Sequence, residues 1–348
     1  MRSKLYITTI SILLFLSGMI TGWFLHTYYN SQKSPESPIT QFKPRPLDKY
    51  TIENLSKAQI QPSKIEIGET VKEDKEFISY FFSFSLDPTL SGKNKKKVTG
   101  LINIPSGNGP FPAVVMFRGY VDQKAYATGD GTRRVGEYFA TNGFITIAPD
   151  FLGYGGSDVE ATNIFESRFQ TYTTALTLLK SIYEPSFAKA MEGKWDGKNI
   201  FIWGHSNGGH LALAFLEITG KAYPTVLWAP VSAPFPYSIL YYLDETEDSG
   251  KLIIQKLAEF FELYDPKLYS VTNYYGKIAP ETPIQIHQGT ADDAVPLNWT
   301  NSLAKTLQGL NLKLDYFTYA DTDHNLQPAW SQVVARDLDF FRKNLTSK

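Results

Sequence analysis

The chain has no cysteine, which excludes disulfides, thiol nucleophiles and thiolate metal sites. It also lacks an excess of either charge: 34 basic residues oppose 35 acidic ones, for a formal net charge of −1. A chain without a basic field is not expected to bind nucleic acid. No motif calls for a metal or an organic cofactor. Histidine is scarce, with five in 348 residues, so few side chains can act as a general base.

The N-terminal segment, residues 1–29, is the most apolar part of the sequence. Arg2 and Lys4 precede an uncharged stretch, and the core of that stretch, Leu5–Leu25, spans about 30 Å as a helix, the thickness of a bilayer's hydrocarbon core. This predicts a transmembrane helix that anchors the protein in the membrane. The alternative is a signal peptide that is cleaved to give a secreted protein. Either interpretation places the remaining chain outside the cytoplasm.

Residues 30–48 are rich in proline and are expected to form an extended linker. Residues 49–348 follow as one domain in which apolar strands alternate with helical segments, a pattern typical of a mostly parallel sheet covered by helices on both faces. A helical segment over about 231–280 interrupts the alternation, and its many aromatic residues favour a lid over the substrate pocket. The expected strands are 77–86, 98–104, 113–117, 144–148, 200–203, 225–228, 284–287 and 312–317.

The five residues from Gly204 to Gly208 read Gly-His-Ser-Asn-Gly and match the G-x-S-x-G nucleophile elbow. An apolar strand pattern precedes them and an apolar helix pattern follows, as the elbow requires. The glycines are expected where a Cβ would collide with neighbouring backbone. Ser206 is therefore the predicted nucleophile, at the sheet edge of an α/β-hydrolase fold.

A serine hydroxyl needs a base, and the base needs an orienting carboxylate. His324 is the best candidate base because it lies in a polar loop between the last strand and the last helix; His210, on the helix after the elbow, is the rival. The acid should lie between nucleophile and base in the sequence. Asp292 and Asp293 both follow the strand 284–287, and their spacing does not separate them.

Two backbone N–H groups are expected to form the oxyanion hole. One belongs to Asn207, directly after the nucleophile. The other should lie in the loop after the strand 113–117, which makes the Tyr120 N–H the candidate.

Together these motifs resemble the catalytic domain of the prolyl oligopeptidase family. The similarity rests on Gly204–Gly209, on Gly289–Pro296 (Gly-Thr-Ala-Asp-Asp-Ala-Val-Pro) and on the separation of Asp292 from His324. In the family the first Asp of such a pair is the triad acid, so the resemblance implies Asp292.

Two departures from the family pattern are visible: Arg118-Gly119 and Gln288-Gly289 stand where the family usually has His-Gly. Residues 49–96 are also too few for the β-propeller that many relatives carry before this domain.

The sequence thus predicts a serine hydrolase with a Ser206–Asp292–His324 triad that needs no cofactor. The resemblance implies a serine peptidase without a propeller, acting on peptides. A carboxylesterase or lipase acting on acyl esters is the first alternative. A membrane-tethered binding protein on an inactive hydrolase scaffold is the second.

Overall fold

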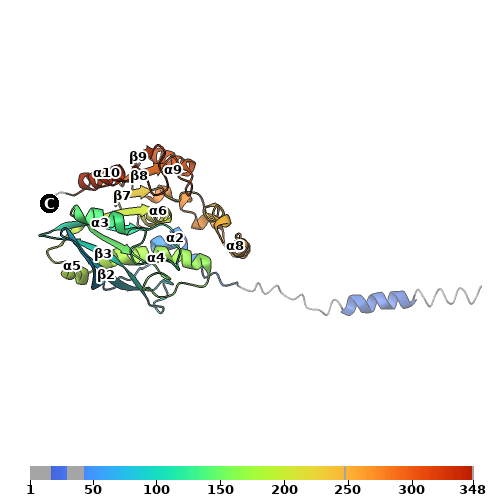
Figure 1. The fold of residues 1–348 in the computed structure, drawn as a ribbon. Coiled ribbons are helices and arrows are strands. Elements are labelled where there is room, and N and C mark those ends of the chain that lie inside the picture. Colours follow the sequence, from blue (N-terminus) through green and yellow to red (C-terminus); the bar gives the residue numbers. More distant parts are fainter. Residues whose placement is uncertain (1–16, 30–42, 247, 347–348) are drawn as a thin grey trace, which may run out of the picture. The chain divides into compact units, whose positions relative to one another are not determined.

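The computed structural model describes residues 17–29, 43–246 and 248–346, and the chain divides into two compact units, residues 1–44 and 45–348 (Figure 1). In the first unit, residues 17–29 form a helix. Among the described helices, none combines the length and the apolar character that a bilayer crossing requires. The expected span Leu5–Leu25 lies partly outside the described residues, as does most of the expected linker.

The second unit begins at Arg45, inside the segment expected to be linker. The physical reason is Leu47, which is buried in the core and whose backbone N–H donates to the Tyr264 hydroxyl at 3.2 Å. A short 3-10 helix, Asp48–Tyr50, and helix α2, Ile52–Lys57, follow and carry further buried residues.

The described residues of this unit form one nine-stranded sheet in the order β1-β2-β3-β5-β4-β6-β7-β8-β9. The first three strands pair antiparallel with their neighbours, and β3 is antiparallel to β5; all later pairs are parallel. The expected mostly parallel sheet is therefore confirmed. The strands are β1 Glu66–Glu73, β2 Phe77–Leu86, β3 Lys96–Pro105, β4 Phe111–Phe117, β5 Ile145–Pro149, β6 Trp195–His205, β7 Thr225–Trp228, β8 Pro283–Gly289 and β9 Lys313–Tyr319.

Helices cover both faces of the sheet (Figure 1). Along β4, Val115 and Phe117 point into one apolar cluster, whereas Val114 and Met116 point into the other. The first cluster includes residues of α4, α6 and α9, and the second includes residues of α3 and α10. The helices are α3 Arg133–Thr141, α4 Ile164–Ile182, α5 Pro185–Ala190, α6 Asn207–Thr219, α9 Leu297–Gly309 and α10 Trp330–Lys343.

The segment between β7 and β8 is a run of short helices, as its apolar spacing predicts. Its aromatic side chains pack on α4: the Phe165 and Phe260 rings lie 5.2 Å apart, and those of Phe169 and Tyr269 lie 5.0 Å apart. The segment contains α7 Tyr237–Leu240, α8 Lys251–Leu263 and the 3-10 turns Leu243–Glu245, Pro266–Tyr269, Val271–Asn273 and Tyr275–Lys277. These contacts hold the insertion beside the sheet edge where the strands β6 and β8 end.

Candidate active site

Ser206 occupies the sharp turn between β6 and α6. Its backbone has φ 57° and ψ −120°, a strained conformation for a residue with a side chain. A Cβ on Gly204 would lie 2.5 Å from the Gly208 carbonyl oxygen, and one on Gly208 would lie 1.9 Å from the Phe117 oxygen. Both glycines are thus required for steric reasons, and the turn presents Ser206 at the carboxyl edge of the sheet.

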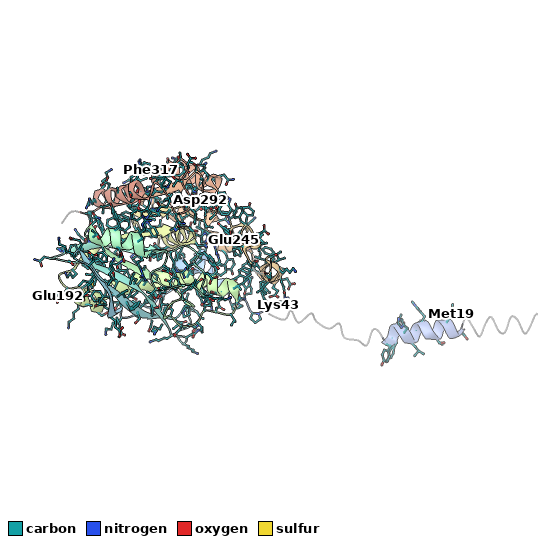
Figure 2. All side chains as sticks on the ribbon, in the orientation of Figure 1. Met19, Lys43, Glu192, Glu245, Asp292 and Phe317 are labelled. Atoms are coloured by element: carbon teal, nitrogen blue, oxygen red, sulfur yellow. The ribbon has the colours of Figure 1, made fainter. Side chains whose placement is uncertain are left out.

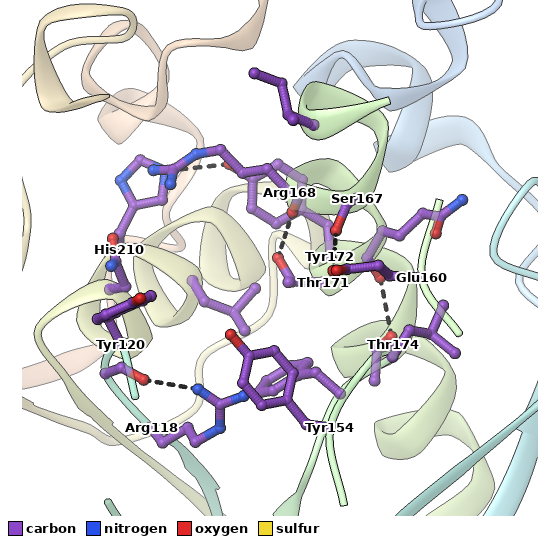
Figure 3. A pocket seen from close by; sticks show the side chains of 17 residues that line it. Arg118, Tyr120, Tyr154, Glu160, Ser167, Arg168, Thr171, Tyr172, Thr174 and His210 are labelled. Atoms are coloured by element: carbon purple, nitrogen blue, oxygen red, sulfur yellow. Dashed lines mark hydrogen bonds between the residues drawn. The ribbon is translucent and has the colours of Figure 1, made fainter. Parts of the chain in front are cut away.

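Ser206 lines a cavity of about 500 Å³, called here the Ser206 cavity. His324, Asn207 and Tyr120 line it too, together with residues of the insertion such as Ile239. A second cavity of about 240 Å³, the Arg118 cavity, adjoins it and shares Gly119, Tyr120, Arg168 and Asn207 with it (Figure 3).

His324 and Asp292 are in direct contact. His324 Nδ1 lies 2.9 Å from one carboxylate oxygen of Asp292 and 3.1 Å from the other. Because a carboxylate only accepts, the Nδ1–H is the donor, and Nε2 is left for a reacting hydroxyl. Within the described residues, Ser206 Oγ makes no hydrogen bond to His324; such bonds are often long before substrate binds.

Asp292, labelled in Figure 2, sits in the loop after β8 and its carboxylate is fully buried. The backbone N–H groups of Ala294 and Val295 donate to it at 3.0 and 2.8 Å. Burial raises the pKa of Asp292, but the His324 and backbone hydrogen bonds outweigh burial and hold it below its ordinary value. Asp293 is exposed and, among the described residues, makes no hydrogen bond to His324.

The other described histidines of the hydrolase unit form hydrogen bonds away from the Ser206 hydroxyl. His210, the rival base, is buried: its Nδ1–H donates to the Val231 carbonyl at 3.1 Å and its Nε2 accepts from the Tyr172 hydroxyl at 3.1 Å. Burial, and after it the charge of Arg168, lowers the pKa of His210 to about 3. His287 is a core residue at 0 % exposure.

His205 has a role that the sequence does not reveal. Its Nε2–H donates to the backbone carbonyl of His324 at 3.0 Å, and the two rings lie 4.6 Å apart. Burial, followed by the His324 charge, lowers the pKa of His205 to about 4, so the ring is neutral at neutral pH. The residue next to Ser206 thereby holds the loop that carries His324.

The loop after β4 passes directly against the nucleophile turn. A Cβ on Gly119 would lie 2.9 Å from the Ser206 Cβ and 3.5 Å from its Oγ. Among the described residues, neither the Tyr120 N–H nor the Asn207 N–H has a hydrogen-bond partner. Two free donors beside a serine hydroxyl suit a developing oxyanion.

Arg118 is buried beneath this loop. Its guanidinium donates to the Gly119 carbonyl at 2.9 Å and to the Asp150 carbonyl at 3.1 Å. It also stacks on Tyr154, 3.9 Å from the ring centre (Figure 3). The Asp150 carboxylate in turn accepts from the Tyr126 hydroxyl at 2.6 Å. The Arg118 side chain thus fixes the loop that follows β4.

Gln288, the second departure from the family pattern, contacts Asp292. Its side-chain amide donates to Asp292 at 2.8 Å, and its carbonyl oxygen accepts from the Thr300 hydroxyl at 2.7 Å. No sequence signal identified these contacts, because they depend on how the loop after β8 folds back over the Gln288 side chain.

The sheet topology and the strand–turn–helix around Ser206 define the class: this is a serine hydrolase of the α/β-hydrolase fold. Within that class, the model of the prolyl oligopeptidase family matches residues 136–348, and the chain belongs to that family. No curated protein matches the chain significantly.

Solved structures similar to this chain include both esterases and peptidases. Acetyl xylan esterase 1 from Thermoanaerobacterium is 20 % identical, with a TM-score of 0.53, over 85 % of this chain and 94 % of its own. An S-formylglutathione hydrolase from Agrobacterium tumefaciens is 18 % identical, with a TM-score of 0.55, over 81 % and 100 %. A puromycin-hydrolysing peptidase from Mycobacterium tuberculosis is 15 % identical, with a TM-score of 0.53, over 84 % and 40 %. At these identities the likeness establishes the fold alone.

Proposed function

We propose that the protein hydrolyses acyl substrates through a covalent acyl-enzyme, with Ser206 as nucleophile, His324 as general base and Asp292 as the orienting acid. The observation that carries this proposal is the 2.9 Å contact between His324 Nδ1 and the buried Asp292 carboxylate at the wall of the Ser206 cavity. A neutral imidazole held in this tautomer has its Nε2 free to accept a proton.

In the proposed reaction, Ser206 Oγ forms a bond to the carbonyl carbon while His324 Nε2 takes the hydroxyl proton. The carbonyl oxygen becomes an oxyanion that accepts from the N–H groups of Tyr120 and Asn207. Collapse breaks the bond to the leaving group, which receives the proton from His324. Water then attacks the acyl-enzyme by the same steps and restores Ser206. Asp292 stays ionised and stabilises the imidazolium.

Family membership supports a peptide substrate, and we rank a serine peptidase slightly ahead of a carboxylesterase. The apolar side chains of Ile239 and Ile253 in the cavity wall favour the ester alternative, including a lipase. A matched series of nitrophenyl esters of increasing acyl length and nitroanilide peptides, with Ser206→Ala as control, separates these cases. Hydrolysis of the peptides that Ser206→Ala abolishes supports the peptidase. Hydrolysis of the esters alone supports the carboxylesterase instead. Faster hydrolysis of esters with long acyl chains supports the lipase.

A binding protein on an inactive scaffold is the competing proposal from a different class. It predicts that the folded protein turns over no member of either series. A detectable hydrolysis rate that depends on Ser206 contradicts it.

The uncharged N-terminal run supports a further part of the proposal: a membrane anchor with the catalytic domain outside the cytoplasm, or a secreted form after cleavage. Carbonate extraction of membranes from cells expressing the full chain tests it, with protease added to intact spheroplasts to report orientation. Release of the intact chain by carbonate, or protection of the domain from protease, contradicts the anchored form.

A further inference from the structure

The wall of the Ser206 cavity carries hydrogen-bond donors that no described residue satisfies. Ser238, at the start of the insertion, is 2 % exposed, and its hydroxyl has no partner among the described residues. The same holds for the buried hydroxyl of Tyr242, a few residues further on. Both residues line the cavity that also contains Ser206. Buried hydroxyls left without partners are rare in native proteins and call for an explanation.

Arg168 on α4 adds a positive charge to the same wall. It lines both the Ser206 cavity and the Arg118 cavity, where Figure 3 shows it beside Tyr172 and His210. Its side chain forms no ion pair and no hydrogen bond with any residue in the described part of the chain. Burial lowers the pKa of Arg168, yet a guanidinium remains charged at neutral pH.

The acidic side chains nearby do not neutralise this charge. Glu160, in the wall of the Arg118 cavity, accepts from the Ser167 hydroxyl at 2.6 Å. Glu245, in the wall of the Ser206 cavity, is exposed to solvent. Arg168 is half-buried, and a charge partly withdrawn from water without a partner is costly, so an anion brought by a ligand is the natural complement to Arg168.

We propose that Arg168, Ser238 and Tyr242 bind a carboxylate of the substrate while its scissile carbonyl lies at Ser206. One guanidinium and two hydroxyls supply a single positive charge and several donors, which match the single charge and the acceptor sites of one carboxylate. The site shares one cavity with the nucleophile, so the carboxylate and the reacting carbonyl belong to the same molecule. The inference rests on the proposed function and names its substrate class: acyl compounds that bear a free carboxylate.

The carboxylate has two possible sources, the acyl group or the leaving group. Two pairs of chromogenic or ultraviolet-absorbing esters distinguish them. The first pair is 4-nitrophenyl hemisuccinate and its neutral methyl ester, with the charge on the acyl side. The second pair is 4-acetoxybenzoate and its methyl ester, with the charge on the leaving group. For each pair, the ratio of kcat/KM for the charged to the neutral member is measured on the full chain in detergent.

The wild type is expected to favour the charged member of one pair by about ten- to a hundredfold, the contribution of hydrogen bonds from a charged donor. Arg168→Gln is expected to abolish this preference, and Arg168→Lys to keep part of it. Tyr242→Phe, which keeps the ring, is expected to reduce it by a few fold. Arg342→Gln removes an exposed arginine on α10 and serves as the matched control with the wild-type ratio.

A second measurement keeps the site testable if hydrolysis fails. Binding of free succinate, followed by calorimetry, is compared with binding of succinamide and inorganic phosphate. Succinate binding that Arg168→Gln removes supports the carboxylate site, even if no ester is hydrolysed and the proposed function falls. Equal hydrolysis of both members of both pairs, an unchanged ratio in Arg168→Gln, tighter binding of phosphate than of succinate, or no succinate binding overturns the inference.

Discussion

Replacing Arg118 by methionine tests how the oxyanion donor is held. The Arg118 guanidinium donates to the Gly119 carbonyl at 2.9 Å, and that carbonyl shares a planar trans peptide with the Tyr120 N–H. The two groups point in opposite directions, so fixing the carbonyl aims the N–H. Hydrogen bonds from a charged donor contribute about 1.5–3 kcal/mol, and each 1.36 kcal/mol corresponds to a factor of ten. We therefore expect Arg118→Met to lower kcat by about ten- to a hundredfold.

KM should change little, because the oxyanion forms only on the way to the transition state and is absent from the bound substrate. Steady-state kinetics on a nitrophenyl ester give both constants, and a thermal melt shows whether the variant is folded. Arg134→Met is the matched control: Arg134 stacks on Trp330 at 3.8 Å and, among the described residues, its side chain makes no hydrogen bond to Gly119. A folded Arg118→Met variant with kcat within twofold of the wild type, or a loss confined to KM, refutes the positioning role.

Three further predictions test separate parts of the account. Gly119→Ala places a Cβ 2.9 Å from the Ser206 Cβ, and should cost about a hundredfold or more in kcat; wild-type turnover by the folded variant contradicts it. Asp292→Asn should lower kcat by roughly 10⁴-fold, whereas Asp293→Asn, on an exposed side chain, should stay within about twofold; equal losses contradict the assignment of the acid. Glu217 is buried, its carboxylate has no hydrogen-bond partner among the described residues, and burial raises its pKa well above 4.5. Because the folded state holds this proton more tightly than the unfolded state, wild-type stability falls as pH rises above 4.5. Above pH 4.5, the free energy of unfolding of Glu217→Gln should therefore rise relative to that of the wild type, by at most about 1.4 kcal/mol per pH unit in urea unfolding. A difference between the two proteins that does not change with pH contradicts this prediction.

The parallel core of the fold is readable from the sequence because its strands are buried on both faces. Such strands appear as short apolar runs, and the expected run 113–117 lies within β4, Phe111–Phe117. β1, Glu66–Glu73, was not predicted, since this edge strand is mostly exposed and shows no alternation of apolar residues. β6 begins at Trp195 rather than at Ile200, because most of the residues before Ile200 are polar and, apart from Asn199, partly or fully exposed.

In the candidate site, too, local features are readable from the sequence, whereas contacts between distant segments are not. The elbow at Ser206 is local, so its glycines could be interpreted from sequence order alone. The proximity of His324 to the loop after β8 follows from strand order, since β8 and β9 are neighbours and parallel. The choice between Asp292 and Asp293 required the resemblance to a family, because only the turn geometry decides which carboxylate receives the backbone N–H groups of the loop.

Roles that depend on contacts between distant loops were not accessible from the sequence. Arg118 was visible as a departure from the family pattern, but the Asp150 carbonyl and the Tyr154 ring, which it also contacts, lie in a segment that only the fold brings against it. Arg168 gave no signal, because an arginine on a helix is ordinary; that it has no carboxylate partner among the described residues is visible only in the fold.

Labelling with a fluorophosphonate probe tests the central claim, that Ser206 is an activated nucleophile. The folded wild type and Ser206→Ala are incubated with the probe, and the modified peptide is identified by mass spectrometry. The account predicts a single adduct on Ser206 and no labelling of Ser206→Ala. An unlabelled wild type, or an adduct on another residue that persists in Ser206→Ala, contradicts it.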